Sequence, residues 1–350
     1  MVKNNYSIDS LFKKQDIKKI IEKNVAKKTI TIKNYQILKT FGKKSLKRFI
    51  LSVSYQTSPK SQLFKIIIKY NIILEELEHE YYILEKLANR KYQNNFFKTA
   101  KPLFYSEKLS LFIYQKITFT SILNYLYSQK KLFYKIAEKI ARGLSFFHQI
   151  DFKIPAGKNI NYKKYLIENL DSIQKAVKKH PLNKLEKKQF QLIFNQVKKY
   201  IETDKFRKKS LIHGDFQTRN LLLSQKSFWV IDLARWGVFS PSYDLGTFLL
   251  QVDKDFNLFA SPKEINLFKE HFLKTYQQTI KITPNQKKDI NYFQAFICLQ
   301  LIEYTAAGGP IYEIGEILLT PRSFTIRNLL KKATSCLNSK DIDLTFYKFY

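Results

Sequence analysis

Cysteine is scarce in this chain of 350 residues, which contains only Cys298 and Cys336. Two cysteines cannot build a disulfide framework, and their spacing matches no metal site. A run of about 18 apolar residues, the minimum for a membrane-spanning helix, is also missing. The most apolar stretch, residues 292–307, contains two glutamines and a glutamate, so we expect a buried helix there. The amino terminus lacks the apolar core of a signal peptide, and we therefore expect a cytoplasmic protein.

Acidic residues are few relative to basic ones. The chain has 29 Asp and Glu against 61 Lys and Arg, which gives a formal net charge of +32. Only eight of the basic residues are arginine, a skew typical of AT-rich codon usage, and codon bias therefore explains part of the excess. The charge is nevertheless unevenly placed: residues 1–235 carry a net charge of +30 and residues 236–350 a net charge of +2. A basic field of this kind attracts nucleic acid and anionic membrane surfaces, so both explanations stay open.

Apolar residues make up 45% of the chain and aromatic residues 15%, which is typical of a globular protein rather than a disordered one. A chain of 350 residues can bury a substantial core, as one large domain or as two lobes. No linker, internal repeat or low-complexity tract separates its parts.

The most informative stretch is 211–232, which reads Leu-Ile-His-Gly-Asp-Phe-Gln-Thr-Arg-Asn, three leucines, a polar turn and Phe-Trp-Val-Ile-Asp. Two apolar runs flank the turn at 224–227, which predicts a short hairpin. The hairpin brings Asp232 back beside the loop that holds Asp215 and Asn220. Hard oxygen ligands are what a Mg²⁺ ion carrying nucleotide phosphates needs, and a third oxygen group is free to take a proton from a hydroxyl.

Protein kinases carry a catalytic Asp, a metal-binding Asn shortly after it, and a second metal-binding Asp on the next hairpin. Asp215, Asn220 and Asp232 have this order and spacing. With His-Gly-Asp at 213–215 and Tyr-Asp-Leu-Gly at 243–246, the chain resembles the aminoglycoside phosphotransferase/choline kinase family of small-molecule kinases. The resemblance implies an α+β, protein-kinase-like two-lobed fold, with a small antiparallel β N-lobe, a largely helical C-lobe and ATP between them.

Three segments are expected on this basis. A basic helical segment occupies residues 1–28, the N-lobe residues 29–116 and the C-lobe residues 117–350, which include a lysine-rich helical insert at 152–210. The amphipathic helix within 7–24 should pack on the body of the protein, with contact to a membrane surface as the alternative.

Alternating apolar residues predict strands at 29–39 and 48–55, joined by a turn with a single glycine, Gly42. In a kinase-like lobe this hairpin covers the ATP phosphates. Backbone N–H groups near Gly42 and the hydroxyl of Ser45 are therefore candidate phosphate contacts. An ordinary hairpin turn is the alternative.

An apolar strand at 63–69 ends in Lys69, which resembles the kinase lysine that holds the α- and β-phosphates. Lys65, earlier in the strand, is the alternative. The helix predicted at 74–88 carries Glu80, which matches the glutamate that pairs with that lysine.

Two further strands, at 102–105 and 109–114, precede Gln115-Lys116-Ile117. The resemblance implies that these three residues form the hinge, where backbone groups of Gln115 and Ile117 bind the adenine edge. The remaining predicted helices lie at 121–127, 131–148, 243–252, 262–279, 287–306 and 323–338.

The resemblance also assigns roles at the central motif. Asp215 would orient the acceptor hydroxyl and receive its proton, and Asn220 and Asp232 would hold Mg²⁺. His213 would support the loop through hydrogen bonds rather than exchange protons. Arg219, directly before the asparagine, touches the γ-phosphate or simply crosses the surface, and both interpretations stay open.

Only eleven residues separate Asp232 from Asp244. A protein kinase needs an activation segment in that interval, so the short spacing favours a small-molecule acceptor. Asp244 resembles the helix-start aspartate that braces the catalytic loop, and His148 is interpreted as a packed or capping residue.

The predicted function is transfer of the γ-phosphate of ATP, with Mg²⁺, to a hydroxyl of a small molecule such as a sugar, an amino alcohol or a saccharide-containing metabolite. The basic charge argues mildly against a polycationic acceptor. The alternative is a catalytically inactive kinase-like protein that holds nucleic acid or an anionic membrane on its basic surface, and an active kinase with such a contact is a third possibility. No obligate protein partner is evident.

Overall fold

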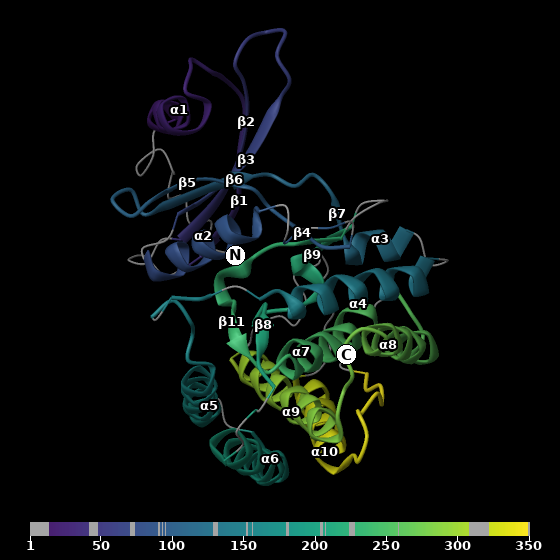
Figure 1. The fold of residues 1–350 in the computed structure, drawn as a ribbon. Coiled ribbons are helices and arrows are strands. Elements are labelled where there is room, and N and C mark those ends of the chain that lie inside the picture. Colours follow the sequence, from purple (N-terminus) through teal and green to yellow (C-terminus); the bar gives the residue numbers. More distant parts are fainter. Residues whose placement is uncertain are drawn as a thin grey trace. The chain divides into compact units, whose positions relative to one another are not determined.

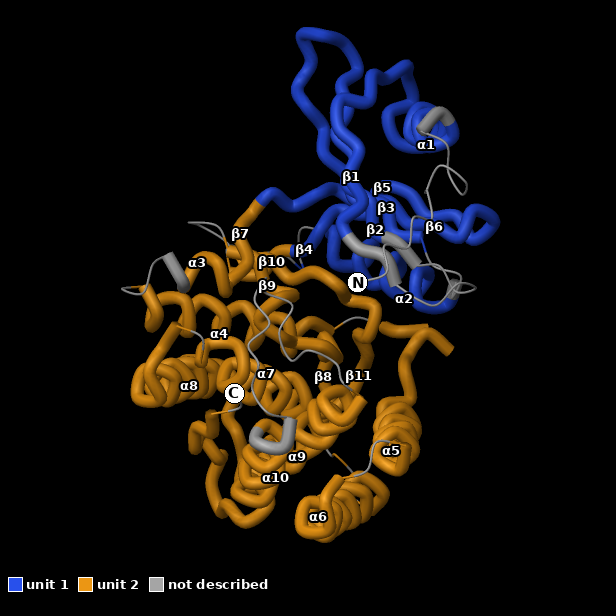
Figure 2. The backbone as a smooth tube through the Cα atoms, turned by 180° about the vertical axis from the view of Figure 1, so that it is seen from behind, with its two compact units in different colours: residues 1–92, 99–118 blue, residues 93–98, 119–350 orange. Residues whose placement is uncertain are grey.

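The computed structural model describes residues 14–41, 48–70, 74–89, 92, 94, 96–128, 132–151, 153–155, 157–179, 182–203, 206, 208–223, 228–257, 259–307 and 322–348. The chain forms two compact units, shown in Figure 2. Unit 1 contains residues 1–92 and 99–118, and unit 2 contains residues 93–98 and 119–350.

Unit 1 is built on a five-stranded antiparallel sheet of order β1-β2-β3-β6-β5 (Figure 1). Its elements are the helix α1 (Lys14–Ile21) with a following π-helical turn (Glu22–Ala26), the strands β1 (Thr31–Phe41), β2 (Arg48–Gln56), β3 (Phe64–Tyr70), β5 (Pro102–Ser106) and β6 (Leu111–Gln115), and the helix α2 (Leu74–Leu87). The five strands and α2 lie close to the ranges that the apolar patterns predict.

The core of unit 1 shows why α1 forms. Ile17 and Ile21, one helical turn apart, are 2% and 0% exposed and join the same apolar cluster as Leu51 and Val53 of β2 and Ile113 of β6. A helix this short is not stable alone and depends on such packing. The expectation that this segment packs on the protein body is met for α1, while the part of the predicted helix before residue 14 lies outside the described residues.

Unit 2 is largely helical. Its helices are α3 (Ile122–Ser128), α4 (Phe133–Gln149), α5 (Tyr162–Lys179), α6 (Lys184–Thr203), α7 (Ser242–Phe256), α8 (Pro262–Gln277), α9 (Pro284–Ala306) and α10 (Arg322–Asn338). Its short strands are β7 (Thr120–Ser121), β8 (Ser210–Ile212), β9 (Leu221–Leu223), β10 (Phe228–Val230) and β11 (Gly237–Phe239), and β4 (Lys98–Thr99) lies beside β10.

Local signals set several boundaries in unit 2. Helices α8 and α9 both begin with a capping box and a proline in the first turn: Ser261 pairs with Glu264, and Thr283 with Gln286. Helix α7 is buried along its whole length, and α9, which contains the predicted apolar stretch, is buried on most sides. Together with α5, α6 and α10 they form one apolar cluster, so the lysine-rich insert packs on unit 2 as a helical hairpin. Among the described helices, none is both long and apolar enough to span a bilayer.

Candidate phosphotransfer site

The hairpin predicted around the turn at 224–227 is present in unit 2. Strands β9 and β10 are antiparallel, with Val230 opposite Leu221, and the Ile231 N–H donates to the Asn220 carbonyl at 3.0 Å. The turn at 224–227 lies outside the described residues. This pairing places Asp232 next to Asn220 along the end of the hairpin, as the apolar pattern predicts.

The carboxylate of Asp215 is held from two sides. The side-chain amide of Gln217 donates to Asp215 Oδ2 at 2.7 Å, and the amide of Asn220 donates to the same oxygen at 3.2 Å and to the Asp215 carbonyl at 2.9 Å. Asp215 is half-buried, so its carboxylate keeps contact with solvent. An oriented, accessible carboxylate is what a group that receives a hydroxyl proton requires.

Asn220 and Asp232 have the oxygen atoms that a divalent cation needs as ligands. Since the nitrogen of the Asn220 amide points to Asp215, its oxygen is turned elsewhere, and no described residue donates to it. Asp232 is exposed and adopts the left-handed region, with φ 62° and ψ 56°, which few residues other than glycine, asparagine and aspartate adopt. An amide oxygen and a carboxylate on adjacent positions are suitable ligands for Mg²⁺.

His213 is a structural bridge. Its Nε2–H donates to the Ile231 carbonyl at 3.0 Å, and its Nδ1 accepts from the Asp215 N–H at 3.2 Å. These two bonds require the neutral ring with the proton on Nε2. The imidazole is fully buried and therefore links the loop to the hairpin, which agrees with its predicted supporting role.

Asp244, at the start of α7, binds the backbone of the same loop. Its carboxylate accepts from the His213 N–H at 2.7 Å and from the Gly214 N–H at 2.9 Å, and it is completely buried. His148 of α4 donates to it from Nε2 at 3.1 Å, and Tyr276 of α8 donates to His148 Nδ1 at 2.8 Å. Burial, together with Asp244, raises the pKa of Tyr276, so its phenol keeps its proton. His148 thus belongs to a buried brace, as its interpretation as a packed residue requires.

Glycine is required at position 214. Gly214 has φ +77°, and a side chain there would collide with the Tyr162 hydroxyl and the Arg235 carbonyl. The same hydroxyl donates to the Arg235 carbonyl, so Tyr162 brings α5 against both Gly214 and the segment that follows Asp232. No sequence pattern signals this contact, because Tyr162 is separated from the motif by 50 residues of the insert.

Arg235 is a second residue that the sequence analysis did not assign. Its side chain is exposed and makes no hydrogen bond or ion pair to any described residue. Partial desolvation of the guanidinium group opposes its charge, but Tyr165, Asp215 and Tyr243 together raise its pKa. A permanent positive charge therefore lies within electrostatic range of Asp215.

The outer face of the small sheet is apolar. Leu222 and Trp229 lie opposite each other and are half-buried, whereas their neighbours in β9 and β10 are fully buried. The ring of Phe119 lies 5.6 Å from that of Trp229, and Lys98 lies 5.7 Å above the same indole. A half-exposed apolar face beside the candidate metal ligands Asn220 and Asp232 suits a flat aromatic base. It was missed because an apolar strand residue is usually interpreted as core.

In unit 1, Lys69 and Glu80 form a direct pair. Lys69 Nζ lies 2.8 Å from each carboxylate oxygen of Glu80, which is 2% exposed. Lys65, by contrast, is exposed and makes no described side-chain contact. The geometry thus favours Lys69 over Lys65 as the lysine that Glu80 fixes.

Two of the three backbone N–H groups in the predicted hinge, residues 115–117, already donate hydrogen bonds within unit 1. The Gln115 N–H donates to the Lys101 carbonyl and the Lys116 N–H to the Lys65 carbonyl, both at 2.9 Å. The N–H of Ile117 makes no backbone bond to the described residues. Ile117 therefore keeps a donor for a ligand, whereas the Gln115 N–H is already used. Ser45 lies outside the described residues.

Comparison with known proteins decides the family. Residues 73–278, more than half of the chain, match the phosphotransferase enzyme family (APH). The chain belongs to this family. Family membership, predicted from the motif around Asp215, is thereby confirmed, and this phosphotransferase is a small-molecule kinase by family. No curated protein sequence matches it.

Solved structures agree with the fold. An amicoumacin kinase in complex with AMP-PNP, Ca²⁺ and Ami has a TM-score of 0.59 at 13% identity, covering 93% of this chain and 94% of that one. A choline kinase from Cryptosporidium parvum has 0.59 at 14% identity, covering 91% and 95%. The choline kinase LicA from Streptococcus pneumoniae has 0.55 at 16% identity, covering 92% and 98%. The predicted α+β, kinase-like fold, with an N-terminal antiparallel sheet and a mostly helical C-terminal part, is confirmed.

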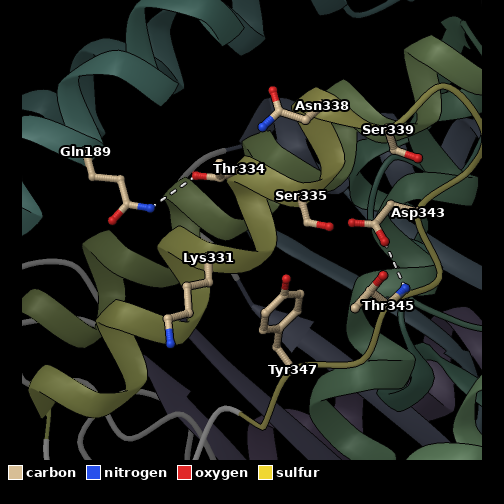
Figure 3. A pocket seen from close by; sticks show the side chains of 9 residues that line it. All are labelled: Gln189, Lys331, Thr334, Ser335, Asn338, Ser339, Asp343, Thr345 and Tyr347. Atoms are coloured by element: carbon tan, nitrogen blue, oxygen red, sulfur yellow. Dashed lines mark hydrogen bonds between the residues drawn. The ribbon is translucent and has the colours of Figure 1, made fainter.

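Two features of this phosphotransferase are not part of the site around Asp215. Arg219 is exposed and makes no described side-chain contact, so neither of its two interpretations gains support. A groove of about 520 Å³ lies elsewhere in unit 2, between α6, α10 and the C-terminal segment (Figure 3). Its lining is polar, including Gln189, Asp343 and Tyr347, and it contains none of the predicted site residues.

Proposed function

We propose that this chain transfers the γ-phosphate of ATP to a hydroxyl group of a small molecule. The observation that carries the proposal is the carboxylate of Asp215, which Gln217 and Asn220 hold in one orientation while it stays accessible. A general base must be oriented in this way before the acceptor arrives.

Each remaining group has a role in that reaction. Asp215 orients the acceptor hydroxyl and takes its proton. Asn220 and Asp232 would hold Mg²⁺, which when bound neutralises charge on the phosphates. Lys69, fixed by Glu80, contacts the α- and β-phosphates.

Each unit offers a further candidate contact for the adenine base. Ile117 offers a backbone N–H to its edge, and Gln115 offers backbone groups other than its engaged N–H. The apolar face of Leu222 and Trp229 suits the plane of the ring. Ser45 and Arg219 remain candidate phosphate contacts by position in the sequence alone.

The short segment after Asp232 supports a small acceptor. A single 3₁₀ turn, the three-residue strand β11 and the start of α7 at Ser242 fill the interval to Asp244. No segment able to dock a polypeptide substrate is present in this interval, all of which the structure describes. We propose a neutral or anionic acceptor, such as a sugar, because the unpaired guanidinium of Arg235 would disfavour a cation near Asp215.

The test is transfer of labelled γ-phosphate from Mg·ATP to a panel of acceptors. The panel contains sugars and sugar acids together with choline, streptomycin and amicoumacin, since structurally similar proteins include a choline kinase, an amicoumacin kinase and APH(2")-IIa, solved as a ternary complex with streptomycin and ATP. Asp215→Asn preserves the size of the side chain and should abolish labelling, whereas Asp341→Asn, at a distant exposed carboxylate, should leave it unchanged. Labelling that persists in Asp215→Asn would refute the assigned base.

Nucleotide binding is tested separately. Lys69→Met should weaken Mg·ATP binding, and Lys65→Met, a matched change in the same strand, should not. Wild-type protein that binds no Mg·ATP would refute the proposed function as a whole.

A further inference from the structure

The tip of the α5–α6 hairpin carries an unusual surface. Residues 180–183 connect the two helices, and exposed lysines and leucines stand on either side of this connection. We name this surface the tip patch; it consists of Lys178, Lys179, Lys184, Leu185, Lys187, Lys188 and Leu192.

The two leucines are the first component. Leu185 is 75% exposed and Leu192 57%, and no other described large hydrophobic residue is as exposed. They are seven residues apart, so they lie on the same side of α6, two turns apart. The opposite side of α6 holds the buried Phe190, Ile193 and Val197. The exposed leucines therefore do not contribute to the packing of the hairpin on the rest of unit 2.

The five lysines are the second component. All are exposed, and none of their side chains makes an ion pair or a hydrogen bond with a described residue. The one carboxylate within this stretch, Glu186, is 6% exposed and turned toward the N–H of Asn183, 3.3 Å from its Oε2. The tip patch thus carries five lysines without a described ion-pair partner, and Lys188, three residues after Leu185 and four before Leu192, lies beside both leucines on α6.

The hairpin itself is firmly attached. Helix α6 packs against α5, α9 and α10, and both views show α5 and α6 at one edge of unit 2, away from α8 (Figures 1 and 2). Gln189 of α6 donates to Thr334 of α10 at 3.1 Å. A fixed edge that combines lysine and leucine can engage a surface without rearrangement of the fold.

We propose that the tip patch docks this protein on an anionic phospholipid bilayer. Leu185 and Leu192 would enter the interfacial layer, and the lysines would contact the headgroup phosphates. Nucleic acid is a poorer fit, because its backbone offers nothing to exposed leucines and the patch has no arginine or aromatic residue to stack on a base.

The proposal concerns where the protein binds in the cell and does not rest on the phosphotransfer reaction. Its test is flotation with vesicles of phosphatidylcholine alone or mixed with phosphatidylglycerol, at physiological salt. Wild-type protein should float with the mixed vesicles and not with phosphatidylcholine. Lys184→Glu with Lys188→Glu should lower binding roughly thirtyfold or more, and Leu185→Ser roughly tenfold.

Matched controls separate the patch from general charge. Lys263→Glu with Lys274→Glu makes the same charge change at exposed positions on α8, and Leu63→Ser replaces a 40% exposed leucine of unit 1. Both should bind like the wild type, and circular dichroism should show that all variants fold. Three outcomes would overturn the proposal: no preference for anionic vesicles, an equal loss in the α8 control, or binding of polyuridylate through the same lysines without vesicle binding.

Discussion

Replacement of Asp244 by asparagine tests whether this carboxylate holds the loop around Asp215 in place. The side chain is completely buried, and three donors converge on its two oxygens: the N–H groups of His213 and Gly214 and the ring of His148. Asparagine has the same shape but only one acceptor oxygen. In its better orientation it keeps the bonds to His213 and His148 and turns its NH₂ group toward the Gly214 N–H.

The magnitude can be worked out from that geometry. A hydrogen bond to a charged acceptor contributes about 1.5–3 kcal/mol, and a buried donor left without a partner costs about 1–3 kcal/mol. We therefore expect Asp244→Asn to lower the free energy of unfolding by roughly 3–5 kcal/mol, a large part of the total of about 5–15 kcal/mol for a typical protein. Because the Gly214 N–H lies next to Asp215, phosphate transfer should fall as well.

Urea unfolding measures the first effect and the turnover number under saturating Mg·ATP the second. Asp341→Asn is the matched control, because that side chain is 73% exposed and its described partners are Lys287 and the N–H of the adjacent Ile342. It should shift the free energy by less than about 0.5 kcal/mol. If Asp244→Asn unfolds like the control and keeps its turnover number, the carboxylate does not hold the loop and the reasoning fails.

Three further predictions concern other groups. Lys69→Met should destabilise unit 1 by about 3–5 kcal/mol in urea unfolding, because it removes the ammonium group that contacts both oxygens of the buried Glu80 carboxylate; an unchanged midpoint would contradict this. Cys336 should resist thiol reagents at pH 8 in the folded protein, because burial raises its pKa to about 12, and rapid labelling before unfolding would count against it. Burial alone would raise the pKa of Asp343, but Lys332 lowers it below its usual value. Its contribution to stability is therefore present above the unfolded pKa of about 3.9 and is lost as pH falls through the lower folded pKa, so Asp343→Asn should flatten the acid side of the stability curve.

Much of the site could be predicted because its signals are local. Apolar runs on either side of a polar turn specify the β9–β10 hairpin, and the hairpin alone brings Asp232 to Asn220. A strand ending in Lys69 and a helix with Glu80 on its buried side likewise predict that these two meet. In each case the distance along the chain is short, or one regular element fixes the direction of the side chain.

The other parts of the fold and site depend on contacts that no local sequence pattern predicts. Strands β7, β8 and β11 have two or three residues each, too few for an alternation to show. Tyr162 reaches the Arg235 carbonyl from across the insert, and Lys332 of α10 donates to the Asp343 and Thr345 carbonyls of the C-terminal segment. These residues look like ordinary tyrosine and lysine in the sequence, because their partners are backbone atoms, which every residue carries.

Backbone partners also explain how a chain only 13–16% identical to solved kinases keeps their fold. The loop around Asp215 is held mainly through backbone groups: the N–H groups of His213 and Gly214 bind Asp244, and the Ile231 carbonyl binds the His213 ring. Such bonds constrain only the few residues that supply a side chain, and they leave the others free to change. Since the fold depends on so little of the surface, it does not require the lysines of the α5–α6 tip. The two exposed leucines beside these lysines are the observation from which we propose a contact outside the chain, and vesicle binding is the direct measurement of that contact.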